Sequence, residues 1–128
     1  MFKITTKSNE QIIDKTFEFS LKLIELYIFL IKNNEFELSE KLLKSGTSIR
    51  ENLEQTFAAG NKQDFILKLA QASKDAVETR YWLKLIQMKH MVNSCCDDCV
   101  EKLNEIIAML SYLEQKKTNF RLSNIHLN

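Results

Sequence analysis

Residues 9–32 read NEQIIDKTFEFSLKLIELYIFLIK and contain neither proline nor glycine. Apolar side chains recur at steps of three and four, the spacing that keeps one face of an α-helix directed at a core. Two adjacent seams run along the segment: Ile13, Phe17, Ser20, Ile24, Tyr27 and Ile31 form one, and Ile12, Thr16, Phe19, Leu23, Leu26 and Leu30 form the other. A single bundle core needs one seam, so the segment predicts a long helix with a second surface to bury.

Three further segments repeat this spacing, which predicts four helices over about 9–32, 35–59, 62–92 and 95–116. Each expected start carries a capping pattern, a Ser or Asn followed three residues later by an acid or amide. The four pairs are Ser8/Gln11, Asn34/Glu37, Asn61/Asp64 and Ser94/Asp97. Short connections make consecutive helices antiparallel neighbours. The expected fold is all-α: an up-down-up-down four-helix bundle, one domain over 1–128, with a loose C-terminal tail at 117–128.

The composition narrows the class of protein. The chain has 128 residues, a formal net charge of +1, no proline and two glycines. So few breakers favour long helices over a β fold with many turns. The near-neutral charge argues against a strongly electrostatic nucleic-acid binder. The sequence shows neither a signal-peptide pattern nor a membrane-spanning apolar run, so we expect a cytoplasmic protein with no membrane contact and reduced cysteines.

Catalysis would need a nucleophile–base pair, a metal cage or a phosphate-binding loop, and the sequence offers no convincing example. Cys95, Cys96 and Cys99 form the densest cluster of reactive groups. Structural zinc normally takes four ligands from two separated pairs, and no second pair exists. Core packing of Cys96 and Cys99 is the expected role, with a reactive thiolate at Cys95 as the open alternative. We expect no catalytic residue, no metal site, no cofactor and no small-molecule substrate.

Small and polar residues within the second and third expected helices have a different predicted role. Glycine inside a helix costs about 1 kcal/mol against alanine, so Ser45 and Gly46 predict the close approach of a neighbouring helix or subunit. Tyr81, Trp82 and Leu83 are three consecutive large residues, which cannot all face one core. The candidates for an oligomer interface or for helix register are Ser45, Gly46, Arg50, Asn52, Glu54, Glu78, Tyr81 and Trp82.

Basic residues of the third expected helix form a candidate binding face. Residues 61–93 hold six basic and three acidic groups. Arg80 and Lys84 are four residues apart and share a helical face. A ring of copies would repeat such a face and build a modest basic surface. Lys74, Arg80 and Lys84 are therefore the candidates for contact with a nucleic acid or another partner.

Two stretches carry a family resemblance. Residues 45–54, SGTSIRENLE, and residues 64–83, DFILKLAQASKDAVETRYWL, closely resemble helix signatures of the bacterial four-helix-bundle proteins encoded in intervening sequences of large-subunit ribosomal RNA genes. The resemblance implies a bundle assembled as a ring-shaped homopentamer. It also implies relation to the accessory variability proteins of retroelements, which are more basic and bind nucleic acid and a reverse transcriptase.

Together these features predict a non-catalytic oligomeric binding module. The expected ligand is structured RNA or a ribonucleoprotein partner. The alternative is a protein–protein interaction scaffold with no nucleic-acid role.

Overall fold

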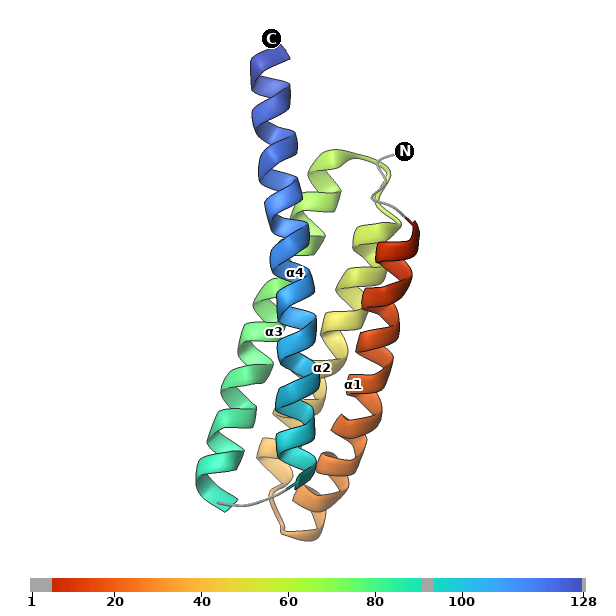
Figure 1. The fold of residues 1–128 in the computed structure, drawn as a ribbon. Helices are drawn as coiled ribbons and strands as arrows, with labels where there is room; N and C mark the ends of the chain where they lie inside the picture. The colour runs from red at the N-terminus through yellow and green to blue at the C-terminus, as the bar shows by residue number, and fades with distance from the viewer. Residues whose placement is uncertain (1–5, 91–93, 128) are drawn as a thin grey trace.

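The computed structural model describes the backbone of residues 6–90 and 94–127 and the side chains of residues 9–90 and 95–116. The helices are α1 (Thr6–Lys32), α2 (Phe36–Phe57), α3 (Lys62–His90) and α4 (Ser94–Leu127), and the described residues contain no strand. They lie side by side in one elongated bundle, and the chain turns back at alternate ends (Figure 1). The expectation of an all-α fold with four helices is confirmed. None of the described helices combines the length and apolar character that a membrane span requires.

The core comes from one seam on each helix. The expected seams of α3 and α4 are buried throughout: Phe65, Leu69, Ala72, Ala76, Thr79, Leu83 and Ile86 on α3, and Cys96, Cys99, Leu103, Ile106, Leu110 and Leu113 on α4. On α1 the buried seam is the one that contains Ile12, Phe19 and Leu30. The other seam lies toward the outside, where Phe17 and Ile24 remain about half exposed.

Two helix starts differ from the expected caps. Asn34 does not cap α2, because Glu35 holds the N-cap position and makes no capping bond with its side chain. Asn34 instead adopts a left-handed backbone with φ 61° and ends α1. Its N–H bonds to the carbonyl of Ile31 and that of Glu35 to Leu30, the bond pattern of a Schellman motif. Ser8 is not a cap either, because α1 already begins at Thr6.

The two remaining caps are those expected for α3 and α4. The Asn61 cap is confirmed: its Oδ1 accepts from the Asp64 N–H at 2.9 Å, and its Nδ2 lies 3.2 Å from Asp64 Oδ2. The cap expected at Ser94 adjoins residues 91–93, which lie outside the described residues, so it stays a prediction.

The expected loose tail is instead part of a helix. α4 continues from residue 117 to Leu127, and this end projects beyond the other helices (Figure 1). The physical reason is the absence of a stop signal, because residues 117–128 contain neither proline nor glycine.

The four helices form a closed cycle of contacts. α1 packs on α2 and α4, and α3 packs on the same two helices, whereas no α1–α3 contact occurs in the described part of the chain. α1 and α3 therefore occupy diagonal corners of the bundle. Their outer faces therefore lie on different sides of the bundle, which decides where the surfaces described below can act.

Candidate interaction surfaces

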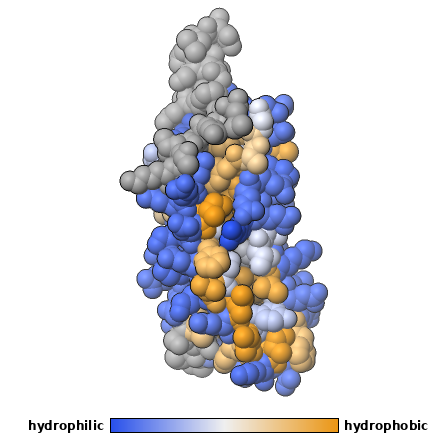
Figure 2. Space-filling view, turned by 90° about the vertical axis from the view of Figure 1, so that its right-hand side faces the viewer, coloured by the Kyte–Doolittle hydropathy of each residue, from blue (hydrophilic) through white to orange (hydrophobic). Residues whose placement is uncertain are grey.

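The outer face of α1 carries a continuous apolar stripe. Phe17, Leu21, Ile24 and Ile28 keep 54, 52, 49 and 47% of their surface exposed. Their spacing of four, three and four residues aligns them along one face. Figure 2 turns the α1 side of the bundle toward the viewer and shows hydrophobic surface running down it. Contiguous exposed apolar surface of this kind marks an interaction site in soluble proteins.

Ion pairs line one border of this stripe. Lys15 Nζ lies 3.1 Å from Glu105 Oε2, and Lys22 Nζ lies 3.7 Å from Asp98 Oδ2, so both pairs join α1 to α4. On the α2 side, the Arg50 guanidinium lies 6.0 Å from the centre of the Phe17 ring. The stripe thus has polar margins, as the rim of a protein interface has.

The outer face of α3 mixes cations with exposed apolar groups. Lys74, Arg80 and Lys84 are all exposed, and none forms an ion pair within the described residues. Tyr81 is 56% exposed and stands among them. Unpaired cations around an aromatic ring can bind phosphate groups and stack on bases. The three predicted contact residues therefore lie on α3 together with Tyr81, whose aromatic ring can stack on a base.

Arg80 lies on the flank of α3 that faces α4. Ser73 donates to Glu114 of α4 at 3.4 Å, and Gln87 donates to Asp97 of α4 at 3.1 Å. Arg80 is seven residues from each, two helical turns, so it shares their side of α3. The cations of α3 therefore spread from its outer face to its α4 flank.

Several candidates for interface or register lie inside the bundle. Ser45 and Gly46 are buried, and Ser45 Oγ lies 3.0 Å from Thr79 Oγ1 of α3. A Cβ atom on Gly46 would come within 2.6 Å of Leu23 Cδ2, so the glycine admits α1 of the same chain. Asn52 Nδ2 donates to Asp75 Oδ2 at 2.6 Å, which ties α2 to α3. These contacts set helix register within one subunit.

Burial affects the carboxyl group that receives this bond. Desolvation raises the pKa of Asp75, and the hydrogen bond from Asn52 opposes that rise. The hydrogen bond from the Asn52 amide therefore stabilises the charged form of Asp75, which burial disfavours.

The remaining candidates lie nearer to solvent. Arg50 Nε donates to Glu54 Oε1 at 2.9 Å along α2. Glu78 is exposed, and Trp82 packs against the core while its ring centre lies 5.0 Å from that of Tyr81.

A groove of about 480 Å3 between α2 and α3 is lined by Glu37, Glu40, Lys41, Lys44, Ser45, Ser48, Asp75, Glu78 and Trp82. Lys41 Nζ lies 5.4 Å from the Trp82 ring centre, so a cation of the chain itself covers that ring.

The cysteine cluster packs in the core. Cys96 and Cys99 are buried and Cys95 is half-buried. Burial raises the pKa of Cys96 to about 11 and that of Cys99 to about 12, which keeps both as neutral thiols. No group of three His, Cys, Asp or Glu side chains able to hold a metal ion occurs among the residues described.

One polar cluster was not predicted from the sequence. Glu35 contacts both Lys89 Nζ, at 2.8 Å, and His90 Nε2, at 3.3 Å. The His90 ring meets Phe29 edge-on, with centres 5.5 Å apart. The hydrogen bond from Lys89 holds the pKa of Glu35 below its ordinary value. This cluster joins the α1–α2 turn to the end of α3, and no local sequence spacing predicts it.

Comparison with known proteins places the chain in a family. The family model described as 23S rRNA-intervening sequence protein matches residues 8–112. A crystal structure of a protein of unknown function from the S23 ribosomal protein family of Bacteroides thetaiotaomicron is similar, with a TM-score of 0.76 and 32% identity. The similarity covers 83% of this chain and 96% of that one. No curated protein matches. The chain belongs to the 23S rRNA-intervening sequence protein family.

Proposed function

We propose that the chain is a non-catalytic binding module that acts as a homo-oligomer in the cytoplasm. The observation that carries the proposal is the exposed apolar stripe of Phe17, Leu21, Ile24 and Ile28 on α1. Burying such a stripe against another copy removes apolar surface from water, which is the main driving force of association. The proposed subunit is an antiparallel up-down-up-down bundle, and the proposed assembly is the ring-shaped homopentamer that the family resemblance implies.

A mass measurement of the native protein tests the assembly. The expected mass is five times the 15.0 kDa of one chain. A particle of 15.0 kDa at high protein concentration would overturn the proposal. An assembly of another size would keep self-association and correct the number of copies.

The proposed ligand is structured RNA or a ribonucleoprotein. Lys74, Arg80 and Lys84 support this choice, because they are exposed and form no ion pair with an acid among the described residues. Each subunit of net charge +1 would attract RNA weakly, but a ring repeats the basic face several times. Binding through phosphates also predicts a steep loss of affinity as salt rises.

Binding to structured fragments of large-subunit ribosomal RNA tests this ligand. The informative variant is Arg80→Glu, and the charge-matched control is Lys44→Glu on α2. The α3 variant should bind more weakly and lower the salt slope by roughly one per lost phosphate contact, while the control keeps most of the affinity. Equal losses in both variants, or no binding at low salt, would count against RNA as the ligand.

A protein–protein scaffold without a nucleic-acid role is the second candidate. The same α1 stripe favours it, since an apolar face suits a protein partner better than RNA. Co-purification from cell extract before and after nuclease treatment separates the candidates. Partners that remain after nuclease treatment support the scaffold, and partners released by it support RNA.

A further inference from the structure

The outer faces of α1 and α3 carry stripes with the same spacing. Both follow steps of three, four, three and four residues, and every member is exposed. The α1 stripe consists of Asp14, Phe17, Leu21, Ile24 and Ile28, and the α3 stripe consists of Lys74, Val77, Tyr81, Lys84 and Met88. The first begins with an acid and the second with a base. The remaining members are apolar except Lys84, whose aliphatic stem can cover apolar surface.

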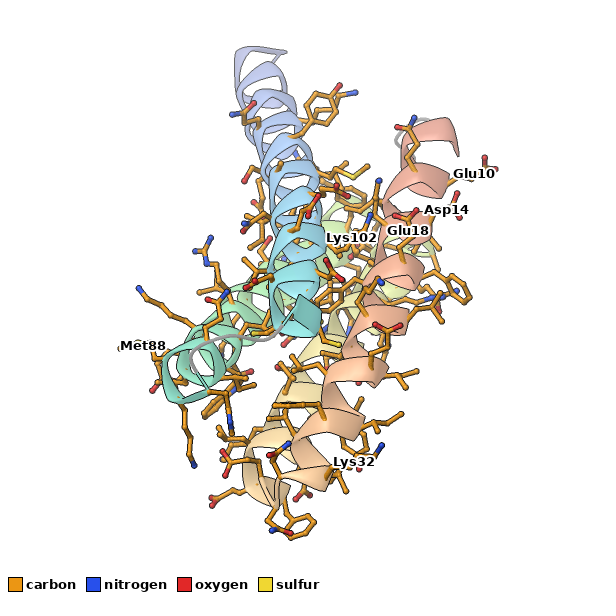
Figure 3. The ribbon with its side chains drawn as sticks, turned by 60° about the horizontal axis from the view of Figure 1, so that its bottom comes forward. Glu10, Asp14, Glu18, Lys32, Met88 and Lys102 are labelled. Atoms are coloured by element: carbon orange, nitrogen blue, oxygen red, sulfur yellow. The ribbon has the colours of Figure 1, made fainter. Side chains whose placement is uncertain are left out.

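The two stripes point away from each other. α1 and α3 sit at diagonal corners, since each packs on α2 and α4. Figure 3 shows Asp14 on the outer edge of α1 and Met88 on the opposite side of the bundle. One copy therefore cannot join its own stripes, but it can offer one to each of two neighbours.

Contacts through α2 place the two stripes along the same part of the bundle. Arg50 of α2 lies against Phe17 of α1, and Asn52 of α2 bonds to Asp75 of α3. Arg50 and Asn52 are only two residues apart in α2. α1 and α3 also run in the same direction (Figure 1).

The charged members stand at the same end of their stripes. Asp14 and Lys74 are each the first member, at the N-terminal end. With Asp14 set beside Lys74, equal spacing pairs the remaining members: Phe17 with Val77, Leu21 with Tyr81, Ile24 with Lys84, and Ile28 with Met88.

We propose that the α1 stripe of one copy docks on the α3 stripe of the next, with the two helices parallel. The inference rests on the proposed self-assembly and assigns the two surfaces that perform it. The opposite charges of Asp14 and Lys74 set the register of this contact. Asp14 then faces Lys74 of the next copy, and Leu21 faces its Tyr81. Because the contact joins two different faces, an open row of copies has a free α1 stripe at one end and a free α3 stripe at the other. Closing the ring buries both.

The arrangement also divides the cations of α3. Lys74 takes part in the contact between copies at one end, and Lys84 lies opposite Ile24. Arg80 stays outside it, on the flank that faces α4. RNA contacts of the assembled ring should therefore depend on Arg80 more than on Lys74.

Two single variants and their mixture test the proposal. Leu21→Asp spoils only the α1 stripe, and Tyr81→Asp spoils only the α3 stripe. Each alone should run at 15.0 kDa, with unchanged helix content, because both side chains are half exposed. Mixed together, the Tyr81→Asp copy still offers an intact α1 stripe and the Leu21→Asp copy an intact α3 stripe. The mixture should form a one-to-one complex of twice the single mass, detectable by native mass spectrometry.

The control is Tyr112→Asp on α4, a tyrosine of similar exposure at 52%, which should assemble as the wild type does. A charge exchange gives a second readout: Asp14→Lys weakens assembly, and adding Lys74→Asp restores it. Wild type that assembles while both single variants also assemble would sink this assignment but not self-assembly. Variants that stay single after mixing would sink it too, because the intact α1 stripe of one copy and the intact α3 stripe of the other should still dock. A monomeric wild type would remove both proposals.

Discussion

Gly46 offers the sharpest test of how α2 packs on α1. A Cβ atom at this position would lie 2.6 Å from Leu23 Cδ2 and 3.4 Å from Phe19 Cε2. Leu23 is 0% and Phe19 is 1% exposed, so neither side chain can move aside into solvent. The methyl group of Gly46→Ala must therefore push Leu23 within a packed core.

Two effects of opposite sign decide the outcome. Alanine in place of glycine gains about 1 kcal/mol of helix propensity. Overpacking a well-filled core costs about 1–3 kcal/mol. Gly46→Ala should therefore lower the free energy of unfolding by about 1 kcal/mol. After Leu23→Ala the clash is gone, so the same change should raise it by about 1 kcal/mol. The stability change caused by Gly46→Ala therefore has opposite signs in the wild type and in Leu23→Ala. The difference corresponds to a coupling energy of about 1–3 kcal/mol between the two positions.

Urea denaturation of the wild type, both single variants and the double variant completes the cycle. All four proteins should be compared at one concentration, because self-association would link stability to concentration. Gly60→Ala is the matched control, since nothing lies within 4 Å of a Cβ built there. A Gly46→Ala change that stabilises both backgrounds equally would refute the close approach of α1 and α2.

Three further outcomes follow from the same geometry. Asn52→Ala should lower the free energy of unfolding by about 1–3 kcal/mol in urea melts, and this loss should shrink as acid protonates Asp75. In the native protein, Cys96 and Cys99 should resist a thiol reagent that modifies them rapidly after unfolding, because their pKa values are raised to about 11 and about 12; equal rates in both states would contradict their burial. Glu35→Gln should lower the thermal midpoint at neutral pH. The lowered pKa of Glu35 means that its contacts contribute stability above the ordinary value of 4.5 and are lost as the pH falls through the folded-state value, so variant and wild type should converge in acid.

The sequence predicts core positions best where a helix has one apolar seam. The α3 seam from Phe65 to Ile86 and the α4 seam from Cys96 to Leu113 match the buried residues, because in each helix one line of apolar and small residues runs along the whole bundle. α1 has apolar residues on most of its circumference, so periodicity alone cannot select the inner seam. Its neighbours decide: Gly46 of α2 lets Leu23 and Phe19 pack against it, and Lys15 and Lys22 reach acids of α4. Leu21 and Ile28 then fall on the outside, although neither belongs to a predicted seam.

Local signals proved ambiguous where one residue suits two roles. Asn favours both the N-cap and the left-handed end of a helix. Asn34 takes the second role because its backbone and that of Glu35 close the last turn of α1. Glu35 then becomes free to meet Lys89, which is 54 positions away in the chain. Contacts of that kind depend on helix length and turn geometry together, so no spacing in the sequence predicts them.

Ion pairs between helices occur on some surfaces of the subunit and not on others. Along the α1–α4 edge, Lys15, Lys22 and Lys102 each meet an acid on the neighbouring helix. These pairs are about half-exposed, so each contributes little stability. Lys74 and Arg80 have no such acid within the described residues. A face whose cations form no ion pair within the described residues, diagonal to an apolar stripe, is not needed to hold one subunit together, so its chemistry is available to another molecule.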